Sequence, residues 1–105
     1  MNRIEKLTEF LQASPEDSFL KHALALEYIK AGNEAGARQL FEEILSKEPG
    51  YVGSYYHLGK LLERASEYEK AIEVYAAGIL VAKKMGDAHA ANELIMAKEE
   101  IEEDE

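Results

Sequence analysis

The sequence predicts an all-α fold of about six helices. Apolar residues recur with the period of a helix, and no segment alternates apolar and polar residues as a half-buried strand would. The two prolines, Pro15 and Pro49, both lie in the first half, and short polar or glycine-containing stretches separate the helical segments. Because every connection is short, neighbouring helices should be antiparallel.

The length and composition indicate one globular domain over residues 1–105. The chain has no cysteine, which excludes disulfides and thiolate metal sites. It contains no apolar run long enough to cross a membrane, and its start lacks the pattern of a signal peptide. We therefore expect a cytoplasmic protein without a membrane partner.

Acidic residues are concentrated at the C-terminal end. The formal net charge is −9, and residues 99–105 (EEIEEDE) hold six of the 21 acids. Without them, 15 acids face 12 bases, so the rest of the chain carries only −3. A net-negative surface repels phosphate backbones, and we expect no nucleic-acid partner.

The first two predicted helices flank the SPED stretch. Residues 2–12 carry an apolar face, and the next helix should run from this stretch to about Ala31. Ser14 is the predicted N-cap, Pro15 suits the first helical position, and Asp17 completes a variant capping box.

The third predicted helix follows a stop and a start signal in adjacent residues. Gly32 is the expected left-handed stop and Asn33 the expected N-cap. The helix, residues 34–47, shows apolar side chains at i, i+3, i+4, i+7 and i+8: Ala37, Leu40, Phe41, Ile44 and Leu45.

Three further helices are expected in the second half. The fourth covers about 52–64, and Ser66 to Glu69 form a second predicted capping box at the start of the fifth. The fifth should end at Gly86, with lysines in its last turn. Asp87 can cap a sixth helix over 87–102, which leaves 103–105 as an acidic tail end.

The sequence repeats itself after 34 residues. With this shift Leu24 aligns with Leu58, Ala25 with Gly59, Ala37 with Ala71 and Phe41 with Tyr75. Small residues match small ones and large apolar residues match large ones. A helix–turn–helix period of 34 is the spacing of tetratricopeptide repeats.

On these residues the chain resembles the tetratricopeptide repeat (TPR) family. The first repeat, 18–51, matches the family at Leu24, Ala25, Tyr28, Gly32, Ala37, Phe41 and Pro49. The second, 52–85, matches at Tyr55, Leu58, Gly59, Leu62, Tyr68, Ala71 and Tyr75. The resemblance implies a short right-handed α-solenoid of antiparallel helix pairs, with 2–12 as the second helix of a truncated repeat and 87–102 as a capping helix. Lys83 stands where the family usually has proline, so the fifth helix should run on to Met85.

The resemblance explains a glycine in the middle of a helix, which costs roughly 0.5–1 kcal/mol relative to alanine. Gly59 would lie where the two helices of a repeat cross most closely, and its missing side chain would let Ala71 and its neighbours approach. Gly78 would do the same against the following helix. The predicted repeat-packing residues are Leu24, Ala25, Tyr28, Ala37, Phe41, Leu58, Gly59, Ala71, Tyr75 and Gly78.

In the TPR family the first helices of the repeats line a concave groove. A helical wheel places the following residues on that side: Phe19, His22, Leu26, Lys30, Tyr56, His57, Lys60 and Arg64. Phe19, Leu26 and Tyr56 would anchor apolar groups of a ligand, and Lys30, Lys60 and Arg64 would pair with its carboxylates. The predicted function is therefore that of a protein–protein interaction module, an adaptor or scaffold that binds an acidic, apolar segment of another protein in this groove.

Four alternatives remain open. In the first alternative, the groove cations bind no ligand and are solvated helix surface. In the second, the acidic end (EEIEEDE) occupies the groove and Ile101 is its one apolar anchor, although a solvated helix end is the simpler interpretation. A carboxylate clamp of the kind that binds chaperone tails is disfavoured, because His22, Leu26 and His57 stand where lysine and asparagine are needed. The chain self-associates into a homodimer through its terminal helices, since two repeats fall short of the three usually needed for stability.

Catalysis and metal binding have little support. His22, His57 and His89 are spaced by about one repeat, but no i, i+4 histidine pair or cysteine accompanies them. The stretch GSYYHLGK has five residues between its glycines instead of four, and Leu61 follows where a phosphate-binding loop needs serine or threonine. We expect no enzyme activity, no metal and no cofactor.

Overall fold

The computed structural model describes residues 2–104, and every regular element in that range is an α-helix. The six helices are α1 (Arg3–Ala13), α2 (Ser18–Lys30), α3 (Glu34–Lys47), α4 (Gly53–Arg64), α5 (Tyr68–Met85) and α6 (Ala88–Asp104). The prediction of an all-α fold with six helices is confirmed. So is the extension of the fifth helix to Met85.

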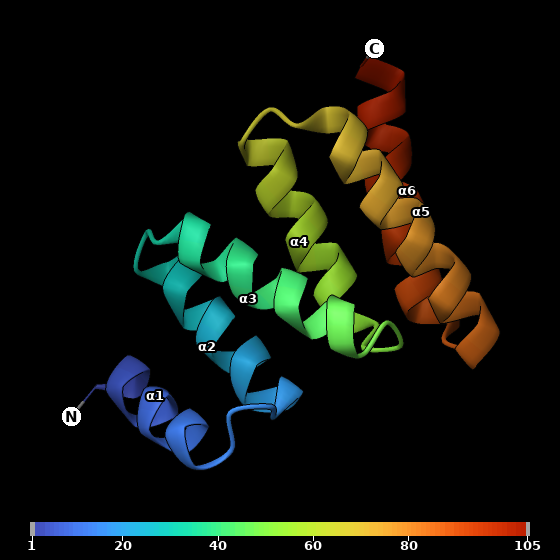
Figure 1. Ribbon diagram of the computed structural model, residues 1–105. Coiled ribbons are helices and arrows are strands. Elements are labelled where there is room, and N and C mark those ends of the chain that lie inside the picture. Colours follow the sequence, from blue (N-terminus) through green and yellow to red (C-terminus); the bar gives the residue numbers. More distant parts are fainter. Residues whose placement is uncertain (1, 105) are drawn as a thin grey trace. The chain divides into compact units, whose positions relative to one another are not determined.

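The chain divides between Glu48 and Pro49 into two compact units, each of which is described by itself. In the first unit α2 packs on both α1 and α3. In the second unit α5 packs on both α4 and α6, and α4 also contacts α6. Within each unit, consecutive helices run antiparallel (Figure 1).

Three helices end in the same hydrogen-bonded motif. At the end of α2, Gly32 adopts φ +83°, its N–H donates to the carbonyl of Ile29, and the N–H of Asn33 donates to the carbonyl of Tyr28. This is a Schellman motif, in which a left-handed residue satisfies the last carbonyls of the helix. Gly86 repeats it at the end of α5 with φ +75°. Both predicted glycine stops are confirmed.

The residue after each glycine caps the next helix. The Asn33 side chain accepts a hydrogen bond from the backbone N–H of Gly36 at 2.9 Å. The Asp87 side chain accepts one from the N–H of Ala90 at 3.0 Å. Stop and start signals in adjacent residues therefore produce tight turns, as the sequence indicates.

Both predicted serine caps are wrong. The Ser14 N–H donates to the carbonyl of Phe10 and closes α1, while the side chain of Asp17 caps α2 by accepting from the N–H of Leu20 at 3.1 Å. Ser66 adopts φ +61° and ends α4 in the same motif as Gly32, which leaves Glu67 as an N-cap without a side-chain hydrogen bond.

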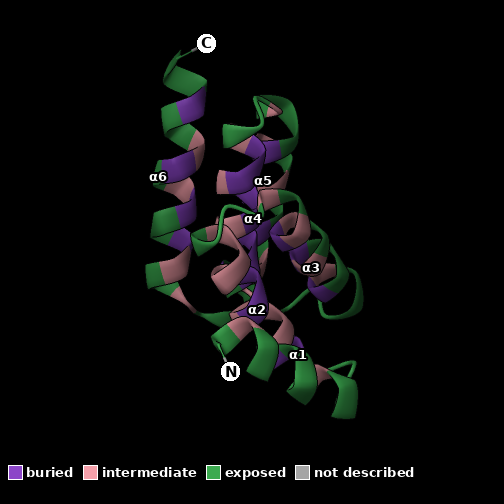
Figure 2. Ribbon diagram, turned by 90° about the vertical axis from the view of Figure 1, so that its left-hand side faces the viewer, coloured by how far each residue is buried: buried purple, intermediate pink, exposed green. Residues whose placement is uncertain are grey.

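The core of each unit is built from the helix faces that the periodicity predicts. Nine of the ten predicted repeat-packing residues are buried, and Tyr28 is partly exposed. In α6 the buried residues Ala91, Leu94, Ala97 and Ile101 follow one face, and Figure 2 shows them as separated purple bands along the helix.

The residue that fills the space beside Gly59 differs from the prediction. A Cβ built on Gly59 would come within 2.7 Å of Cδ1 of Tyr75 and closer still to Cε1, so the Tyr75 ring, and not Ala71, occupies this position. A Cβ on Gly78 would meet Cβ of Tyr55 at 2.7 Å and Cδ1 of Leu94, on the following helix, at 2.9 Å. Both glycines are thus needed for close helix contacts in the second unit.

The acidic end of the chain is part of α6. The helix runs to Asp104, two residues beyond the predicted end, and Ile101 is buried with 6% of its surface exposed. Its apolar anchor is therefore used inside the second unit. Glu105, the last residue of the predicted tail, and Met1 lie outside the described residues.

Candidate functional site

The eight predicted groove residues divide equally between the two units, four on α2 and four on α4. On α2, Phe19 is 70% exposed and Leu26 is partly exposed. The His22 ring makes an edge contact with the buried Phe41 ring, with centroids 5.4 Å apart. His22 therefore packs against the helix pair, while Phe19 points its ring into solvent.

The α2 cation that was predicted to bind ligand carboxylates already has a carboxylate neighbour. Lys30 Nζ lies 3.3 Å from an oxygen of Glu27, one turn earlier on the helix. Arg3 of α1 reaches the same carboxylate oxygen at 3.4 Å. Two cations of the first unit therefore share the single Glu27 carboxylate.

On α4 three of the four predicted residues, Tyr56, His57 and Lys60, form a connected cluster. The rings of Tyr56 and His57 meet edge to face with centroids 5.7 Å apart, and Nζ of Lys60 lies 5.6 Å from the centroid of the Tyr56 ring. This distance is within the range of a cation–π contact. Lys60 Nζ also lies 3.4 Å from the carboxylate of Glu63.

Glu63 connects this surface cluster to the core. The hydroxyl of the fully buried Tyr75 donates to the Glu63 carboxylate. Burial, together with this bond and the negative charge of Glu63, raises the pKa of Tyr75, so its hydroxyl remains a donor throughout the physiological range. Glu63 therefore contacts Lys60 at the surface and Tyr75 in the core.

Helix α6 supplies residues that the sequence analysis did not assign to the site. A hollow of about 180 Å³ is lined by Tyr56 and Lys60 of α4 and by Glu93, Met96, Ala97 and Glu100 of α6. Met96 is 63% exposed. Glu93, Met96 and Glu100 are spaced i, i+3 and i+7, which places them on one helix face.

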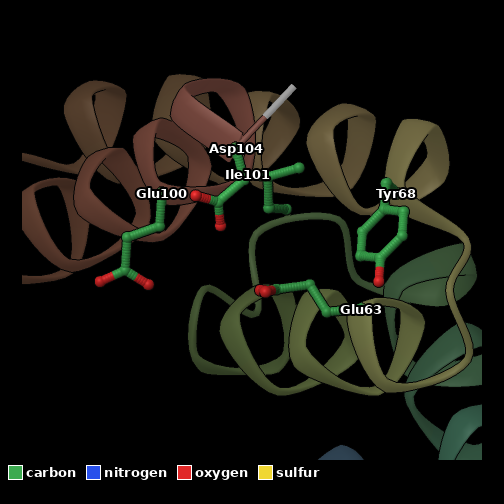
Figure 3. Close-up of a pocket in the computed structure, with 5 residues that line it drawn as sticks. All are labelled: Glu63, Tyr68, Glu100, Ile101 and Asp104. Carbon is green, nitrogen blue, oxygen red and sulfur yellow. The ribbon is translucent and has the colours of Figure 1, made fainter.

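A second hollow shares Glu100 with the first. It measures about 290 Å³ and is lined by Glu63, Tyr68, Glu100, Ile101 and Asp104. Figure 3 shows Glu63 coming from α4, Tyr68 from the start of α5 and the other three from α6, with Ile101 between the α6 carboxylates and the Tyr68 ring. The residues that line the two hollows are called the α4–α6 face below.

The α4–α6 face is more acidic than α4 alone suggests. The predicted groove residues on α2 and α4 include three cations, Lys30, Lys60 and Arg64, whereas α6 adds the carboxylates Glu93, Glu100 and Asp104. Arg64 is exposed and is not among the residues that line either hollow. The predicted excess of positive charge therefore does not describe this face.

The environment of His57 favours its neutral form. Burial lowers the pKa of His57 below 6.5, the nearby charge of Glu93 raises it, and Arg64 lowers it. His89 Nε2 lies 3.1 Å from the same Glu93 carboxylate. Among residues 2–104, no group of three or more histidine, aspartate or glutamate side chains is placed to hold a metal ion.

No helix within residues 2–104 is both long enough and apolar enough to cross a membrane.

Most of the chain is similar to known tetratricopeptide repeat proteins. The profile of the tetratricopeptide repeat family matches residues 28–95. A human interferon-induced protein with tetratricopeptide repeats is 35% identical over 77 residues, which are 70% of this chain and 16% of that protein. A TPR repeat-containing protein of Pseudomonas aeruginosa is 25% identical over 91 residues, 87% of each chain. The chain thus spans about a sixth of the first relative and most of the second.

Solved structures of tetratricopeptide repeat domains also resemble this chain. The solution structure of a tetratricopeptide repeat domain protein from Salinibacter ruber is 47% identical, with a TM-score of 0.82, and the match covers 87% of this chain and 92% of that one. The TPR2B domain of yeast Sti1, solved in a complex with pHsp70, has a TM-score of 0.88 at 19% identity and covers 97% of this chain and 82% of that one. At that identity the likeness to Sti1 shows the fold alone.

Proposed function

Because the chain belongs to the tetratricopeptide repeat family, we propose that it is a non-catalytic protein-interaction module that binds a peptide segment of another protein. The observation that carries this proposal is the α4–α6 face, where two hollows share Glu100 and exposed apolar side chains stand among charged ones. Exposed aromatic and methionine side chains beside polar groups are typical of protein-binding surfaces. The α2 residues Phe19 and Leu26 are proposed as further apolar contacts.

The module would act as an adaptor or scaffold in the cytoplasm. The sequence predicts that Lys30, Lys60 and Arg64 pair with the carboxylates of an acidic, apolar ligand. Two of these cations, however, lie beside Glu27 and Glu63, so an acidic ligand would have to compete with carboxylates of the protein itself.

The proposed function is tested by affinity capture from a lysate of the organism that carries the chain, read by mass spectrometry. The baits are the wild type, a Tyr56→Ser/Met96→Ser variant and a matched control, Leu80→Ser. Leu80 is 72% exposed on α5 and lies outside the α4–α6 face. Circular dichroism verifies that each bait is folded.

A protein that is retained by the wild type and by Leu80→Ser, but lost by the double variant, supports a binding module that uses this face. The same set of proteins on all three baits, or none on any, contradicts it.

A self-associating structural module is the second candidate. Phe10 on α1 is 58% exposed and Leu80 on α5 is 72% exposed, and burying such side chains in a homodimer would be favourable. Light scattering across a concentration series tests this candidate. A dimer that Leu80→Ser or Phe10→Ser dissociates would support it, and a monomer at every concentration would contradict it.

A further inference from the structure

We propose that the α4–α6 face selects a basic segment, one in which lysine or arginine side chains alternate with apolar ones. This inference rests on the proposed function and adds the chemistry of the ligand. The cations on α2 and α4 alone would favour an acidic ligand. Helix α6 also belongs to the face, and its carboxylates make the face acidic, so a basic ligand is favoured instead.

The charges of the face support a basic occupant. Four of the residues that line the two hollows are carboxylates, Glu63, Glu93, Glu100 and Asp104, and Lys60 is the one base among them. Complementary charge guides encounter and excludes partners of the wrong sign.

The four carboxylates differ in what they already contact. Glu63 is held by Lys60 and by the Tyr75 hydroxyl, and Glu93 lies beside His89. Within the described part of the chain, neither Glu100 nor Asp104 forms an ion pair. These two carboxylates, one turn apart on α6, are therefore the ones available to a ligand cation.

The apolar residues of the face suit the stems of basic side chains. Met96 is 63% exposed beside the smaller hollow, and Tyr68 is 48% exposed at the larger one, where Figure 3 shows its ring. Lysine and arginine bury their methylene stems against apolar surface while the charged head stays near polar groups. The Tyr68 ring can also accept a cation over its face.

The chain's own acidic end is excluded as the occupant. Ile101, its one apolar anchor, is buried in α6, and its remaining residues carry the same charge as the face. The proposed occupant is therefore a basic segment of another protein.

Fluorescence anisotropy with defined probes tests the inference on the full chain. The basic probe is a labelled peptide that repeats Leu-Lys-Gly-Lys, the acidic probe has glutamate at every lysine position, and the neutral probe has glutamine there. The test variant is Glu100→Lys/Asp104→Lys. The control is Glu99→Lys/Glu103→Lys, which makes the same change of net charge on exposed residues of the same helix outside the two hollows.

We expect the basic probe to bind most tightly and its affinity to fall with added salt. The test variant should weaken its binding by roughly tenfold, and the control by less than about twofold. Met96→Gln should weaken the basic probe as well, which attraction by net charge alone would not produce.

Equal weakening by both double variants would overturn the inference, because it would show attraction to the net charge alone. Basic and neutral probes with equal affinity would also overturn it. Tightest binding by the acidic probe would reject the basic ligand while leaving the proposed function intact. The capture experiment uses no probe, so failure of the proposed function would appear there independently.

Discussion

The ring of Tyr75 lies directly against the backbone of Gly59, in the space where any larger residue would place its Cβ. This contact joins α4 to α5 at the centre of the second unit, where Tyr75 is fully buried. From there the Tyr75 hydroxyl reaches Glu63, and Glu63 lies beside Lys60 on the α4–α6 face. The packing of the helix pair and the arrangement of the proposed binding face therefore depend on the same residues.

Replacing Gly59 should destabilise the protein even with the smallest side chain. Gly59→Ala gains helix propensity, but its Cβ would overlap the Tyr75 ring, and forced overpacking of this kind costs about 1–3 kcal/mol. Gly59→Leu should unfold the second unit. Gly50→Ala is the control, because a Cβ at Gly50 meets nothing within 4 Å.

Chemical denaturation measures the free energy of unfolding of each variant. A Gly59→Ala variant as stable as Gly50→Ala would show that the Tyr75 ring can move aside without cost, and the account of this contact would be rejected.

Removing the Tyr75 hydroxyl should cost stability while leaving the ring in place. Tyr75→Phe takes away the donor that the Glu63 carboxylate accepts, and loss of such a charge-assisted bond costs about 1–3 kcal/mol. Tyr68→Phe serves as the control, because Tyr68 is 48% exposed. If the two variants melt at the same temperature, the bond to Glu63 contributes nothing to stability.

The left-handed residue at the end of α4 predicts a stabilising substitution. Ser66 has φ +61° in a motif that uses glycine at Gly32 and Gly86, and a side chain in this conformation costs roughly 1–2 kcal/mol. Ser66→Gly should therefore raise the free energy of unfolding by about 1 kcal/mol. The reverse change, Gly32→Ser, should lower it by a similar amount. A Ser66→Gly variant less stable than the wild type would be inconsistent with the motif.

The pKa of His57 gives a pH dependence of defined sign. Because burial lowers this pKa in the folded protein, the unfolded chain takes up a proton near pH 6.5 that folded His57 resists. Stability should therefore fall as the pH drops below about 6.5, and His57→Gln should remove that part of the loss.

The same histidine reports on the charge of the face. Glu93 raises the pKa of His57, so Glu93→Gln should lower this pKa further, while Glu99→Gln should leave it unchanged. A titration followed by NMR of the imidazole protons measures the shift. An unchanged His57 pKa in Glu93→Gln would show that this carboxylate does not act on His57.

The positions of the helices were predictable because the periodicity of apolar residues and the glycine stops agree with each other. The capping residue of α5 was mispredicted because Ser66 to Glu69 match a capping box, while the hydrogen bonds at the end of α4 require a left-handed residue at Ser66. The repeat contains the necessary information: Ser66 stands 34 residues after Gly32 and takes its conformation.

The binding face was only partly predictable for a different reason. The residues on α4 were identified from the family resemblance, but α6 was interpreted as a cap, and its contribution depends on how it packs beside α4. The spacing of Glu93, Met96 and Glu100 marks a second helix face that could have been considered. Tertiary contacts decide which face of α6 lies beside Lys60, and a helical wheel of one helix contains no tertiary contacts.

Site-specific photo-crosslinking tests most directly whether the α4–α6 face binds another protein. A photoreactive residue replaces Met96 in one preparation and Leu80 in another, and adducts formed in cell lysate are identified by mass spectrometry. Leu80, on α5, is 72% exposed, and Met96 is 63% exposed. The account predicts a defined partner crosslinked from Met96 and not from Leu80, with the contact mapped to a basic, apolar segment. Adducts of equal yield and identity from both positions, or adducts to a second copy of this chain alone, would contradict it.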